Sequence, residues 1–121
     1  MDTRVSAASE ESSLRHLGQR EVLLATVEQL QKDLGAGAHG FDLPEVGPRA
    51  FEDLRGQVLP VLEQLAGTGG NALMVVLYRV DIPESHYRSA MALGGLHHLA
   101  GEVVLRTLQK VLTRLRFAGR Y

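Results

Sequence analysis

One segment of the chain repeats its apolar residues at a spacing that an α-helix places on a single side. Within residues 50–66 these residues recur every three or four positions, and at about 100° per residue they cover about a quarter of the helix circumference. The apolar positions are Phe51, Leu54, Val58, Val61, Leu62 and Leu65. A face this narrow must be buried, so the segment predicts an amphipathic helix packed on other helices.

A proline inside this segment predicts a bend. Pro60 lies on the side opposite the apolar face and removes the hydrogen bond to the carbonyl of Gly56. Because Gly56 has no side chain, the clash with the proline ring is eased. We therefore expect a kinked second helix that continues beyond the proline.

Two further segments carry helical patterns. The first, from a cap at Ser9, Ser12 or Ser13 to about Leu34, ends at Gly35. Its inner side is expected to hold Leu17, Leu23, Leu24, Val27, Leu30 and Leu34. Gly94 and Gly95 are expected to end the preceding element, and the last helix follows them over residues 96–117. Its apolar residues cover about half of the helix circumference, which predicts several neighbours or an oligomer interface. Its inner positions are Ala100, Val103, Val104, Leu108, Val111, Leu112 and Leu115.

The segment 72–80 (ALMVVLYRV) is apolar except for Arg79, so it fits a buried helix or a buried strand. A lone strand leaves backbone groups unpaired, and the sequence offers no second convincing strand. We therefore predict a short central helix, with strand pairing between two copies of the chain as the alternative.

Together these segments predict an all-α fold, a small single-domain bundle of about four to five helices with a long C-terminal helix. The 121 residues fit one helical domain over 12–121, preceded by a disordered or frayed tail over 1–11. A glycine- and proline-rich loop over 35–49 should be held on the core by Phe41 and Leu43.

The most distinctive polar stretch follows the apolar segment 72–80. Asp81 and Glu84 have the spacing of a capping box that would begin a helix over 82–93, and Pro83 is tolerated in its first turn. We expect Arg79 to form an ion pair with these carboxylates, and Tyr78 to complete a structural or interaction junction. A carboxylate-based acid/base site is the alternative.

The charges are distributed unevenly along the chain. Residues 1–53 hold ten acidic and five basic residues, whereas residues 103–121 hold five basic residues and no acidic one. The basic positions form a stripe on the last helix: Arg106, Lys110, Arg114, Arg116 and Arg120. This stripe predicts, as an alternative function, nucleic-acid binding through phosphate contacts, although cations also stabilise the C-terminal end of a helix dipole.

A second alternative is a small enzyme or metal-binding protein centred on His97, His98 and Glu102. An imidazole and a carboxylate four residues apart share one helix face, with His97 expected toward the apolar side and His86 as a further candidate. Two ligands do not make a site, so no metal and no cofactor are predicted. Gly35, Gly37 and Gly40 match G-x-G-x-x-G, but the strand that a nucleotide loop needs before them is missing.

The chain has no cysteine, no export signal at its start and no apolar run long enough to cross a membrane. These features favour a soluble cytoplasmic protein without membrane partners. Because no catalytic constellation stands out and the last helix has excess apolar surface, the leading hypothesis is a non-enzymatic protein that acts through protein–protein interaction. Its expected partners are a second copy of itself and another protein.

Overall fold

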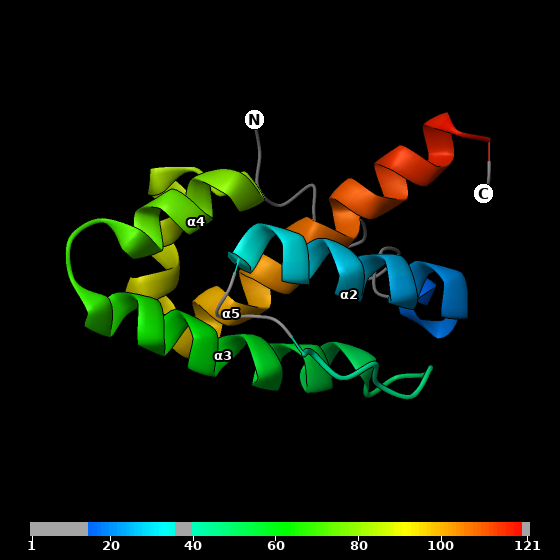
Figure 1. The fold of residues 1–121 in the computed structure, drawn as a ribbon, viewed down its shortest axis with the longest axis horizontal. Helices are drawn as coiled ribbons and strands as arrows, with labels where there is room; N and C mark the ends of the chain where they lie inside the picture. Colours follow the sequence, from blue (N-terminus) through cyan, green and yellow to red (C-terminus); the bar gives the residue numbers. More distant parts are fainter. Residues whose placement is uncertain (1–14, 36–39, 120–121) are drawn as a thin grey trace.

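The computed structural model describes residues 15–35 and 40–119, in which four α-helices pack around one apolar core (Figure 1). No strand occurs in these described ranges, and the predicted all-α fold is confirmed. A short 3-10 turn, η2, precedes the helices. In chain order the elements are η2 (His16–Gly18), α2 (Arg20–Leu34), α3 (Ala50–Thr68), α4 (Ala72–Val80) and α5 (Glu84–Phe117).

The central element is α5, which contacts α2, α3 and α4. Every inner position predicted for residues 96–117 is buried, and Leu99 joins them. The wide apolar arc is explained by this arrangement, because α2 and α3 cover different parts of it. The inner side of residues 96–117 is therefore buried, and the polar edge of α5 is left beside α2.

The predicted apolar face of α3 is confirmed. Leu54, Val58, Val61 and Leu62 are buried, and Phe51 and Leu65 are partly buried against the same core. The helix continues without interruption through Pro60. The bend at that proline remains a prediction.

Residues 72–80 form a helix, as predicted, and its end overturns the predicted capping box. Asp81 has left-handed backbone angles (φ 75°, ψ 43°), and the amide of Ile82 donates to the carbonyl of Leu77 at 2.9 Å. This is a Schellman ending for α4, in which aspartate tolerates the left-handed conformation. Asp81 thus ends one helix, and the next begins at Glu84 after Pro83 without a side-chain cap.

The predicted break at Gly94 and Gly95 is confirmed inside α5. Gly95 has φ 69° and ψ −149°, a combination that is available essentially to glycine alone. Two helical segments, 84–94 and 96–117, therefore meet at this residue with different directions (Figure 1).

The first predicted helix needs two corrections. Residues 16–18 form η2, and Gln19 is extended (φ −107°, ψ 124°), so α2 begins only at Arg20. Leu24 is 42% exposed, and Val22 is buried instead, because the helix is rotated slightly from the side that the pattern predicted. The proposed serine caps and the tail over 1–11 lie outside the described residues.

The loop before α3 is held on the core as predicted. Phe41 and Leu43 pack on the apolar cluster. Gln57 of α3 also fixes the loop, because its side-chain amide accepts from the N–H of Asp42 at 2.8 Å and donates to the carbonyl of the same residue at 2.9 Å.

Candidate anion-binding groove

Helices α2 and α5 lie side by side in opposite directions (Figure 1). Two side-chain contacts show this pairing directly. Gln29 of α2 is hydrogen-bonded to Arg114 of α5. One turn further along α2, Asp33 is hydrogen-bonded to Lys110, which lies one turn earlier on α5. The apolar sides of both helices are turned to the core. Their polar edges are left facing each other at the surface.

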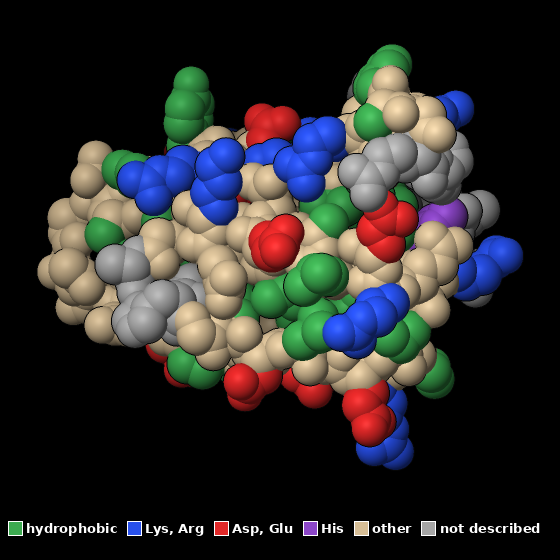
Figure 2. Space-filling model, turned by 45° about the vertical axis from the view of Figure 1, so that its right-hand side comes forward, with side chains coloured by type: hydrophobic (Ala, Val, Ile, Leu, Met, Phe, Trp, Pro, Cys, Tyr) green, Lys and Arg blue, Asp and Glu red, His purple; other side chains and the backbone are tan. Residues whose placement is uncertain are grey.

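An open groove of about 470 Å³ follows these two edges. We call it the basic groove, because its lining contains four cationic residues and no acidic one. Its lining residues are Gln29, Lys32, Arg106, Gln109, Lys110, Thr113 and Arg114. Figure 2 shows Lys and Arg side chains gathered in a row along one edge of the molecule.

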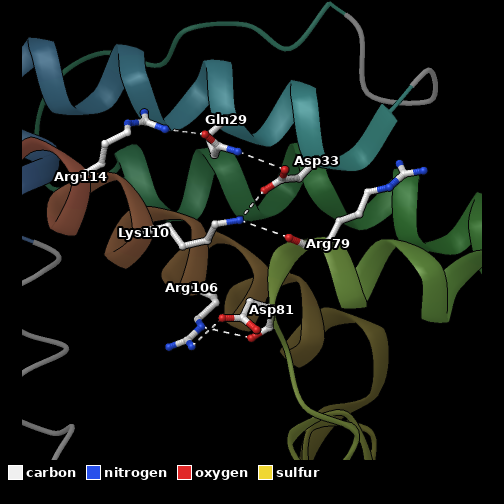
Figure 3. A network of polar contacts seen from close by, with 7 residues as sticks. All are labelled: Gln29, Asp33, Arg79, Asp81, Arg106, Lys110 and Arg114. Carbon is white, nitrogen blue, oxygen red and sulfur yellow. Dashed lines mark hydrogen bonds and ion pairs between the residues drawn. The ribbon is translucent and has the colours of Figure 1, made fainter.

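The base of the groove is an ion pair between Lys110 and Asp33. The Lys110 Nζ donates to the Asp33 Oδ2 at 3.0 Å, and the Gln29 side-chain amide donates to Oδ1, also at 3.0 Å. The Asp33 side chain is only 10% exposed, against 34% for Lys110. Both carboxylate oxygens are thus hydrogen-bonded, as Figure 3 shows, and the Lys110 side chain stays more exposed than its partner.

Two cations of the groove keep their charge uncompensated by any carboxylate in the described ranges. Arg114 donates through Nη1 to the neutral Oε1 of Gln29 at 2.8 Å. Lys32, on the opposite wall, forms no ion pair with another described residue. These two side chains therefore give the groove positive charge that no ion pair with a described carboxylate offsets.

The third α5 cation binds the end of α4. Arg106 donates to the backbone carbonyl and to the carboxylate of Asp81, each at 3.2 Å (Figure 3). The Asp81 side chain is 72% exposed, so water and salt compete for this contact. A bound anion could share Arg106 without a large penalty.

The ion pairs at the predicted junction therefore differ from those expected. Arg79 does not pair with Asp81 or Glu84. Asp81 pairs with Arg106, and Glu84 pairs with Arg88 at 3.0 Å. The carbonyl of Arg79 instead accepts from Lys110 at 3.2 Å. Each carboxylate has its own cation, an arrangement that offers no paired acid and base.

The histidine cluster does not form a metal centre in the described part of the chain. His98 Nε2 lies 3.9 Å from Glu102 Oε2, but the described ranges contain no group of three or more potential ligands. His97 is exposed, which contradicts its expected position on the apolar side, and His86 is also exposed. Gly37 of the glycine motif lies outside the described residues.

Only part of the groove was predicted from the sequence. Arg106, Lys110 and Arg114 line it, Arg116 is exposed outside it, and Arg120 lies outside the described residues. The α2 side, with Gln29 and Lys32, was missed. The only sequence signal for the α2 wall was a polar edge beside the apolar face of this helix. Such an edge does not reveal which other helix will lie next to it.

Comparisons of the chain with family models, curated proteins and solved structures find no match. Among the described helices, none is both long enough and apolar enough to cross a membrane.

Proposed function

We propose that this protein binds nucleic acid through the basic groove. The observation that carries the proposal is the composition of the groove, in which two helices contribute four cations and no lining residue is acidic. Phosphate contacts by lysine and arginine supply most of the affinity in sequence-independent binding. The acidic residues that give the whole chain its net charge of −1 are absent from residues 103–121.

The spacing of the α5 cations suits a linear polyanion. Arg106, Lys110 and Arg114 follow one another at four-residue steps, about 6 Å apart along the helix axis. Lys32 adds a cation on the facing wall. The hydrogen bonds to Asp33, Asp81 and Gln29 hold the α5 cations in place, which lowers the entropy lost on binding.

The lining also favours nucleic acid over an acidic protein. A protein interface has an apolar centre surrounded by polar residues, whereas every residue that lines this groove is polar. Gln29, Gln109 and Thr113 can donate to phosphate or sugar oxygens, as neutral side chains do in nucleic-acid complexes. The groove thus offers charge and hydrogen bonds without an apolar anchor.

Fluorescence anisotropy with labelled oligonucleotides over a salt series tests this proposal. Four phosphate contacts to a single strand predict a slope of log affinity against log salt of about −3. Lys32→Gln and Arg114→Gln should each reduce the magnitude of the slope by about 0.7. Arg49→Gln is the matched control, because Arg49 is an exposed cation that does not line the groove.

The outcomes separate the two classes of polyanion. No binding to any oligonucleotide at low salt would refute the proposal. Tighter binding to poly-glutamate than to an oligonucleotide of equal charge would replace it by an acidic protein partner. Equal effects of Arg49→Gln and Arg114→Gln would show that the groove is not the site.

A second candidate function, association with another copy of the chain, is favoured by the outer face of α4. Met74, Val75 and Tyr78 lie at positions that share one helix face and are 36%, 42% and 86% exposed. A two-fold axis along this face would bury the same three side chains of both copies against each other.

Light scattering after size-exclusion chromatography tests this association. We expect a dimer at tens of micromolar that Tyr78→Asp converts to a monomer. Leu24→Asp is the control, because it introduces the same charge at an exposed apolar residue of α2. A monomeric wild-type protein at that concentration, or equal dissociation by both variants, would rule the interface out.

A further inference from the structure

We infer that Phe117 provides a stacking surface for an unpaired base at the C-terminal end of the basic groove, so that the nucleic acid bound there is single-stranded. This inference rests on the proposed function and narrows its ligand. It comes from an exposed aromatic residue that the core does not use.

Phe117 is the last residue of α5 and is 87% exposed, whereas the neighbouring inner residue Leu115 is 6% exposed. Burying a phenylalanine side chain is favourable, so the packing of this bundle leaves that gain unused. In Figure 1 the C-terminal turns of α5 rise away from α2, and the end of the helix projects from the bundle. The ring is therefore available to a ligand.

The ring lies on the cationic side of the helix. At about 100° per residue, Phe117 falls within about 20° of Arg106 and Lys110 and within about 60° of Arg114. It is one turn beyond Thr113 and Arg114, the last lining residues of the groove. A strand that follows the α5 cations toward the C-terminus therefore reaches this ring next.

Cations in line with an exposed ring match the chemistry of a single strand, in which each unit carries both a phosphate and a base. Proteins that bind such strands combine a positive groove with aromatic side chains on which bases stack. In a duplex the base faces are covered by their neighbours, so a ring beside the groove could not reach them. The arrangement thus selects an unpaired strand.

The test uses the full chain, an oligodeoxythymidylate, a duplex of the same length, and an abasic strand with the same phosphates. Phe117→Leu should weaken binding to the oligodeoxythymidylate roughly 5- to 150-fold and leave the salt slope unchanged. Binding to the abasic strand should not change. Leu93→Ala is the control, because it removes another exposed apolar side chain of α5 that does not line the groove.

A spectroscopic readout separates stacking from a change in stability. The chain has no tryptophan, so Phe117→Trp introduces the only one, and its emission can be excited selectively at wavelengths that the three tyrosines do not absorb. Its emission should be quenched by the oligodeoxythymidylate and not by the abasic strand. That result, with retained affinity, would establish the stacking contact.

The failures are distinguishable. If no strand binds, both the proposed function and this inference fail. If strands bind with the predicted salt slope but Phe117→Leu has no effect, or if duplex and single strand bind equally, only the inference fails. Equal losses in Phe117→Leu and Leu93→Ala would also overturn it.

Discussion

Lys110 on α5 and Asp33 on α2 form an ion pair, 3.0 Å between Nζ and Oδ2, in which the carboxylate is almost fully buried and the ammonium group is not. The same ammonium group donates to the carbonyl of Arg79 at the end of α4. Three helices thus meet at one cation that also lines the groove (Figure 3). Lys110 therefore contributes to stability and also lines the groove of the proposed function.

Lys110→Met should lower the free energy of unfolding by about 2–3 kcal/mol, because it leaves the carboxylate of Asp33 buried without its cation. Urea unfolding measures this change. Adding Asp33→Asn to Lys110→Met should recover at least half of the loss, since the buried charge is then gone. Lys32→Met, which removes a cation without an ion pair, should change stability by less than about 0.5 kcal/mol. Equal effects of the two lysine substitutions would contradict the buried-charge explanation.

Gly95→Ala should destabilise the protein by about 1–3 kcal/mol, because a side chain strains the backbone angles found there. Gly56→Ala is the contrasting variant. Gly56 is a helical residue of α3, and apart from its chain neighbours and the backbone of its own helix no atom lies within 4 Å of an added Cβ. That substitution should stabilise by about 0.5–1 kcal/mol. Thermal unfolding of both variants gives the comparison, and a stabilising Gly95→Ala would show that the break in α5 is not required.

Thr107→Val should raise the free energy of unfolding by about 1 kcal/mol. The Thr107 hydroxyl is fully buried and has no hydrogen-bond partner within the described structure, so its desolvation is not compensated. Thr26→Val is the control, because the hydroxyl of Thr26 is equally buried but donates to the carbonyl of Val22 at 2.8 Å. Chemical denaturation should give a larger gain at position 107 than at position 26, and the reverse order would contradict the prediction.

Gln57→Ala should release the loop before α3. It removes both hydrogen bonds to Asp42, which predicts a loss of about 1–2 kcal/mol and faster hydrogen exchange at the Asp42 amide. Gln64→Ala, an exposed position on the same helix, should leave that exchange rate unchanged. Unaltered protection of Asp42 in Gln57→Ala would mean that Phe41 and Leu43 alone hold the loop.

The sequence predicted the parts of this fold that depend on local periodicity. The face of α3 is an example, because the positions of Leu54 and Val58 on one side follow from helix geometry alone. The choice of a helix for 72–80 needed a second argument, the lack of a pairing strand, and it was also correct. The break at Gly95 was visible as a glycine pair.

What could not be predicted depends on tertiary contacts or on competition between local signals. Asp81 can begin one helix or end another, and the neighbouring residues fit both roles. The rotation of α2 that exposes Leu24 is set by its packing on α5. Predicting the groove also required the packing of α2 on α5. Lys32 and Arg114 are 82 positions apart in the sequence, and only the pairing of their helices brings them to one surface.

Because Gly95 is not helical, the angular positions of the side chains after it do not depend on the number of residues before it. A residue inserted within 84–94 would turn the earlier segment but leave the angular order of every cation after position 95 intact. A residue inserted at about position 102 would rotate all the later side chains by about 100°, carrying Lys110 away from Asp33 and the α5 wall away from α2. An insertion before Gly95 would therefore preserve the geometry of the basic groove, whereas an insertion after it would disrupt the groove.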